Sequence, residues 1–76
     1  MSSIFGEFPN SSNLASYLYD TETQALTITF RSGGRYSYAG VPRDLLQGMI
    51  EADSAGKFFA SNIRSAYSYT KLEGAH

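Results

Sequence analysis

The chain has 76 residues, no cysteine, and a single histidine, His76, at its C-terminus. A chain of this length forms one small domain, which buries only about 60% of the surface that its unfolded form exposes. Disulfides and a zinc site are excluded as sources of stability, so oligomerisation is the common remedy that remains. The net charge of −1 excludes a strongly basic nucleic-acid-binding domain, and any site for an anion must be a local patch.

The N-terminal segment lacks a basic region followed by a long apolar run, and no stretch approaches the roughly 20 apolar residues that span a bilayer. We therefore expect a cytoplasmic protein without membrane contact. Residues 1–10 predict an irregular apolar arm that contains Phe5 and Phe8. These phenylalanines either fold back onto their own domain, which is the commoner outcome, or contact a second copy in a homo-oligomer.

Three strand patterns follow the arm. Residues 14–19 are rich in apolar and aromatic side chains, and residues 25–30 alternate apolar side chains with threonine. Gly33 and Gly34 then reverse the chain into a strand over residues 35–38, and we predict a positive φ angle at Gly34 in particular. The result is an antiparallel meander whose core-facing side chains are Leu26, Ile28 and Phe30.

Two helices are predicted after the meander. Pro42 suits a first helical position, and apolar residues at helical spacing predict a helix over residues 42–52. Ser54 is placed to cap a second helix that extends to about Arg64. The side chains expected to face the core are Leu45, Met49 and Ile50 in the first helix and Phe59, Ile63 and Tyr67 along the second.

These elements predict an α+β fold, in which a three-stranded antiparallel β-meander has two helices packed on one face. The domain is expected to cover residues 11–69. The arm of residues 1–10 precedes it, and a frayed C-terminus over residues 70–76 follows it.

Catalysis is not expected from the residues present. The many serines and threonines have no internal histidine to act as a base. The close acidic pairs, Asp20 with Glu22 and Glu51 with Asp53, lie in a turn and at a helix end, where solvated carboxylates are commoner than metal ligands. We therefore expect a protein that is not an enzyme and that has no cofactor and no metal.

Tyr36 and Tyr38 lie two residues apart on one strand and therefore share one face of it. They can stack on bases, as aromatic residues do on several small RNA-binding sheets, although packing beneath a helix is the commoner role. The basic residues are dispersed and suit an ordinary solubilising surface. Local convergence remains open, because Arg35 follows the turn and Lys57 and Arg64 lie near the two ends of the second helix.

A series of small motifs runs in order from Ser11 to Tyr69. The motifs are Ser12-Asn13, Tyr19-Asp20, Leu26, Phe30, Gly34, Tyr36-x-Tyr38, Val41-Pro42, Ala52-x-Ser54-x-Gly56, Phe58-Phe59 and Ile63-Arg64. Together they resemble the KTSC domain, a family named for the C-terminal extension of some lysyl-tRNA synthetases. The chain departs from the family pattern at Leu18, Leu46 and Ala60, where a small residue, an aromatic residue and an asparagine are more frequent.

The resemblance implies a small binding module from a bacterium or a phage, with a suggested RNA-binding role and no catalytic residues to carry over. Our hypothesis is a non-catalytic module for a nucleotide-containing anionic ligand, either RNA or a small nucleotide that a phage-encoded copy sequesters. Tyr36 or Tyr38 would stack on a base, and phosphate would pair with Arg35, Lys57 and Arg64. The alternative is a protein-protein interaction adaptor that uses the apolar arm or a sheet edge.

Overall fold

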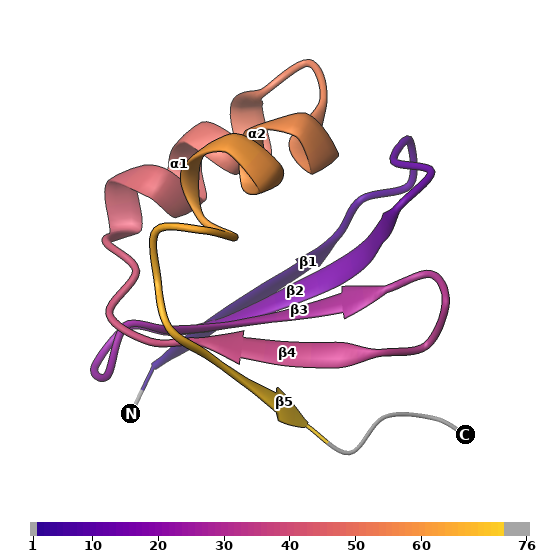
Figure 1. The fold of residues 1–76 in the computed structure, drawn as a ribbon. Coiled ribbons are helices and arrows are strands. Elements are labelled where there is room, and N and C mark those ends of the chain that lie inside the picture. The colour runs from indigo at the N-terminus through magenta and orange to yellow at the C-terminus, as the bar shows by residue number, and fades with distance from the viewer. Residues whose placement is uncertain (1, 73–76) are drawn as a thin grey trace.

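The computed structural model describes residues 2–72, which form a five-stranded antiparallel sheet with two helices on one face (Figure 1). The sheet order follows the chain, so every strand pairs with its sequence neighbour. No helix among these residues has the length and apolar character needed to cross a membrane. The elements are β1 (Ser3–Glu7), β2 (Leu14–Asp20), β3 (Ala25–Phe30), β4 (Arg35–Tyr38), α1 (Arg43–Glu51), α2 (Ala55–Asn62) and β5 (Tyr69–Leu72).

The sheet has five strands where the sequence predicted three. The expected irregular arm contains β1, which pairs along its whole length with β2. The C-terminus that was expected to fray over residues 70–76 contributes to β5, which pairs with β4, and residues 73–76 lie outside the described part of the chain. Both additional strands are short and lie at the edges of the sheet. An edge strand pairs with one neighbour only and shows a weaker apolar pattern, so its sequence does not mark it clearly as a strand.

The two phenylalanines of the arm lie in different surroundings. Phe5 lies opposite Leu18 on the sheet face that the helices leave uncovered, and it is 77% exposed. Phe8 is buried, and its ring centroid lies 5.1 Å from that of Tyr17. The expectation that the phenylalanines fold back onto the domain is therefore confirmed for Phe8 and wrong for Phe5.

The predicted meander and both helices are present. Ser54 caps α2 as expected, because its Oγ accepts a hydrogen bond of 3.3 Å from the backbone N–H of Lys57. Pro42 is the residue that precedes α1 rather than its first helical residue. Among the expected stripe residues of the second helix, Phe59 and Ile63 are buried, and Tyr67 packs against the core from a partly exposed position.

The core lies between the helices and the inner face of the sheet. Leu26 and Ile28 are fully buried, as predicted, and Phe30 packs against them. On α1 the buried side chains are Leu46 and Met49, whereas Ile50 is 41% exposed. The prediction for Ile50 was wrong because the apolar stripe of α1 is centred on Met49 and Leu46, with Leu45 packed against the core on its other flank. Ile50 lies on the far side of Leu46 from Met49, at the outer margin of the stripe.

The turn between β3 and β4 places its positive φ angle at Gly33 (102°), not at Gly34. The backbone N–H of Gly33 donates to the Phe30 carbonyl at 2.9 Å, and the Phe30 N–H donates to the Gly34 carbonyl at 2.8 Å. Gly34 is therefore already part of the hydrogen-bonded ladder, and the reversal is completed one residue earlier than we predicted.

Replacing Gly33 with alanine should destabilise the domain by about 1 to 3 kcal/mol, because alanine is strained at this φ angle. Gly34→Ala is the matched control, since a Cβ there would make only an ordinary contact of 3.5 Å with the Tyr36 ring. Urea denaturation of both variants measures the difference. Equal stability losses would contradict the position of the turn.

Leu46→Ala should lower the free energy of unfolding by about 2 to 5 kcal/mol, since it leaves a cavity beneath α1. Ile50→Ala, in the next turn of the same helix, should cost less, about 1 kcal/mol, because Ile50 is 41% exposed whereas Leu46 is buried. Thermal and urea unfolding of the two variants tests the orientation of α1. A larger loss for Ile50→Ala would show that the helix is rotated.

Candidate functional site

The α2 helix is held on the sheet by the ring of Phe59. Its centroid lies 5.7 Å from that of Phe30 and 5.2 Å from that of Tyr38, both in edge-to-face geometry. This is the arrangement that the charge distribution of aromatic rings favours, and each such pair contributes about 0.5 to 1.5 kcal/mol beyond burial. The contacts fix the distance of α2 from β4.

Beside Phe59, the end of α2 and strands β4 and β5 enclose a cavity of about 280 Å³, which we call the aromatic cleft. Rings form most of its wall, and a single cation stands among the lining residues. The lining residues are Asn13, Phe30, Tyr36, Tyr38, Phe59, Ala60, Arg64, Ser65 and Tyr69.

The rings of the aromatic cleft support one another. Tyr36 packs edge-to-face on Phe30, with 5.5 Å between centroids, and on Tyr69 at 5.4 Å. Tyr69 also contacts Tyr38 at 5.6 Å in a tilted geometry. Tyr38 is buried and Tyr69 is 58% exposed, so the cluster of rings extends from the core to the protein surface. It therefore presents a supported aromatic surface to solvent.

The surroundings of Tyr38 in the cleft raise the pKa of its phenol. Burial raises the pKa of its phenol above the usual value, and the neighbouring Tyr69 adds to the rise. The positive charge of Arg64 acts in the opposite direction on the same pKa. The guanidinium thus acts on the interior of the cleft although Arg64 itself is exposed.

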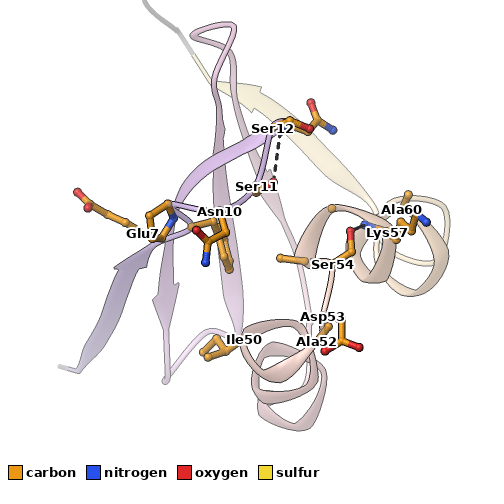
Figure 2. Close-up of a pocket in the computed structure, with 15 residues that line it drawn as sticks. Glu7, Asn10, Ser11, Ser12, Ile50, Ala52, Asp53, Ser54, Lys57 and Ala60 are labelled. Carbon is orange, nitrogen blue, oxygen red and sulfur yellow. Dashed lines mark hydrogen bonds between the residues drawn. The ribbon is translucent and has the colours of Figure 1, made fainter.

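A second depression, of about 560 Å³, lies between the loop that joins β1 to β2 and the turn that joins α1 to α2. We call it the polar pocket. Figure 2 shows Asn10, Ser11 and Ser12 of the loop on one side of it and Ser54 and Lys57 on the other. Asn13 and Ala60 line both the polar pocket and the aromatic cleft. The two cavities are therefore neighbours that share a wall.

The loop that borders the polar pocket is held in place by Arg31. Its Nε donates to the Ser11 carbonyl at 2.6 Å, and its second terminal nitrogen donates to the Phe8 carbonyl at 2.7 Å. The Ser11 hydroxyl oxygen accepts from the backbone N–H groups of Asn13 (3.2 Å) and Leu14 (2.9 Å). Arg31 thus positions this loop. Sequence reasoning missed this role because Arg31 and Ser11 are 20 positions apart in the chain.

The predicted ligand-binding residues fall into three places. Tyr36, Tyr38 and Arg64 come together in the aromatic cleft, and Lys57 lines the polar pocket. Arg35 lies opposite Thr29 on the other face of the sheet, because neighbouring residues of a strand point to opposite faces. The structure therefore brings four of the five residues to the helix side and leaves Arg35 away from them.

Sequence reasoning missed Tyr69 and Asn13 as cleft residues. Tyr69 was predicted to be the last residue before the frayed C-terminus and not part of a strand, and Asn13 reaches the cleft from a loop distant in sequence. Within residues 2–72, no cluster of three or more His, Cys, Asp or Glu side chains is placed to hold a metal ion.

The fold and its inner-face cleft define a small α+β domain, and comparison with known proteins gives its family. The KTSC domain matches residues 10–67, so the chain belongs to the KTSC domain family. The crystal structure of a KTSC domain protein from Yersinia pestis superposes with a TM-score of 0.87 at 32% identity, covering 95% of this chain and 100% of that one.

Relatives in sequence are of two kinds. An uncharacterized protein of Stutzerimonas stutzeri is 47% identical over 64 residues, which are 83% of this chain and 90% of that protein. A lysine-tRNA ligase of Trichormus variabilis is 34% identical over 64 residues, or 84% of this chain. The matched region is only 11% of the ligase, so the domain is a small part of that enzyme.

The raised pKa of Tyr38 predicts a loss of stability in alkali. The unfolded tyrosine titrates near pH 10, and the folded one titrates higher. The stability due to the neutral phenol is therefore complete below about pH 10 and falls as pH rises through the folded pKa. Urea denaturation between about pH 8 and pH 11 should show a smaller loss in Tyr38→Phe than in the wild type. Parallel pH profiles would contradict this assignment.

Proposed function

We propose that this domain is a non-catalytic module that binds a nucleotide-containing ligand, foremost RNA, in the aromatic cleft. The observation that carries the proposal is the grouping of Tyr36, Tyr38 and Tyr69 beside Arg64 in one cavity. Stacking of a base on an aromatic side chain contributes about 1 to 3 kcal/mol and tolerates any base. A guanidinium at the same opening suits the phosphate of the stacked nucleotide.

The size of the cleft also supports this ligand class. At about 280 Å³ it lies near the lower end of small-molecule sites, which suits a single base and its sugar better than a large cofactor. The name of the relative from Trichormus variabilis, a lysine-tRNA ligase, adds an RNA context for a domain of this sequence. A small nucleotide is the other form of the same chemistry, and a phage-encoded copy that sequesters one in a bacterial cytoplasm would use the same contacts.

A second candidate function is a protein-protein interaction adaptor. It is favoured by the pair of Phe5 and Leu18, which lie opposite each other on the uncovered sheet face and are 77% and 42% exposed. Within residues 2–72, the outer edges of β1 and β5 have no neighbouring strand in the sheet order. A second copy or another protein would contact this face rather than the cleft.

Arg64→Ala should weaken binding of a fluorescein-labelled single-stranded oligoadenylate by about tenfold or more, because a charge-assisted hydrogen bond contributes about 1.5 to 3 kcal/mol. Arg35→Ala is the control, since it removes the same charge from the opposite sheet face. Fluorescence anisotropy gives the affinities, and thermal melting checks that both variants fold.

Equal weakening by Arg64→Ala and Arg35→Ala would contradict the cleft as the binding site. If the wild type binds neither the oligonucleotide nor adenosine monophosphate, the nucleotide proposal fails. A change of sedimentation behaviour in Phe5→Ser would then favour the adaptor.

A further inference from the structure

We infer that the ligand is a single-stranded RNA segment of two or more nucleotides that crosses α2, with one base in the aromatic cleft and the next phosphodiester in the polar pocket beside Lys57. The inference rests on the proposed function, because it takes the aromatic cleft as the place of the first base. To the proposed function it adds a second subsite and the path that the strand takes across α2.

The two cavities are neighbours that share part of their lining. Asn13 and Ala60 are the residues that line both of them. Both residues are exposed, and Ala60 carries only a methyl group, so a ligand that leaves the aromatic cleft meets no large side chain from α2 at this point. A strand can therefore pass from one cavity into the other over Ala60.

Cations stand at the two ends of this path. Lys57 lies in the first turn of α2, and Arg64 follows the end of this helix. Ala60, one turn after Lys57, lines the polar pocket together with Lys57 and the aromatic cleft together with Arg64. The backbone N–H of Arg64 donates to the Phe59 carbonyl at 2.9 Å, so Arg64 still follows the end of α2 closely. Each cavity thus has its own cation.

The polar pocket suits a sugar-phosphate chain. The hydroxyl oxygens of Ser11 and Ser54 accept backbone N–H groups, which leaves each hydroxyl hydrogen to donate to a ligand oxygen. Asn10 and Ser12 add an exposed amide and a further hydroxyl to the lining. Phosphodiester oxygens and a ribose 2′-hydroxyl are the groups that such donors and acceptors recognise.

The charge of the polar pocket favours a phosphodiester over a polyphosphate. Lys57 is the cation among its lining residues, and Asp53 and Glu7 are the anions. Glu7 points away from the pocket in Figure 2, so Lys57 is set against the single carboxylate of Asp53. This balance suits one negative charge per linkage, whereas a triphosphate would need more cations at the same place.

The test compares a length series on two charge variants. Wild type, Lys57→Gln and Arg43→Gln are titrated with adenosine monophosphate, an adenylyl dinucleotide and a longer oligoadenylate. Lys57→Gln keeps the helix propensity and the backbone N–H that Ser54 caps. Arg43→Gln removes a charge from the first turn of the other helix, and Arg43 lines neither cavity.

The inference predicts that the wild type binds the dinucleotide and the oligonucleotide at least about tenfold more tightly than the mononucleotide, since each charge-assisted contact adds about a factor of ten. Lys57→Gln should abolish that gain, leave mononucleotide binding unchanged and reduce the slope of log affinity against log salt by about 0.7. Arg43→Gln should change none of these quantities.

Two results separate failure of the inference from failure of the proposed function. If all three ligands bind the wild type equally, or if Lys57→Gln weakens them all alike, the second subsite is overturned while binding in the aromatic cleft stands. If no ligand binds, or if Arg64→Ala binds the mononucleotide as tightly as the wild type does, the proposed function is overturned and the inference with it.

Discussion

The edge-to-face contacts of Phe59 with Phe30 and Tyr38 determine where α2 lies, and both cavities depend on that position. Truncation of a buried phenylalanine costs about 3 to 5 kcal/mol, a large share of the stability of a domain this small. With Phe59 turned toward the sheet, Lys57 lies on the other side of α2, and Arg64 follows the end of the helix at the aromatic cleft. One buried ring thus supports the cleft wall and positions the helix that carries Lys57 and leads into Arg64.

Much of the fold was predictable because its central elements carry strong periodic patterns. The alternation of apolar residues with threonine correctly predicted β3, and the capping serine correctly predicted the start of α2. The edge strands were not predicted, and Gly6 in β1 shows why. A Cβ there would lie 2.7 Å from the Tyr17 hydroxyl oxygen, so the glycine leaves room for the Tyr17 side chain while it weakens the strand pattern of β1. This contact is tertiary, and no local pattern contains it.

The candidate site was predictable to the extent that it depends on strand alternation. Tyr36 and Tyr38 share the inner face, and the same rule separates Arg35 from them, although sequence reasoning grouped all three. Tyr69 was missed because β5 is an edge strand with mostly exposed residues, and its sequence therefore lacks the apolar alternation that marks a half-buried strand. The part played by Arg31 depends on contacts between β3 and a distant loop. The aromatic half of the site was thus easier to find than the polar half.

The most direct measurement is a titration of the ¹⁵N-labelled wild-type domain with short single-stranded RNA, followed by two-dimensional NMR of the backbone amides. The account predicts shifts that grow together for the amides around Ser11, Lys57, Arg64 and Tyr69, with little change at Thr27 on the uncovered sheet face. Shifts confined to the uncovered face around Phe5 and Leu18, or no shifts at any RNA concentration, would contradict it.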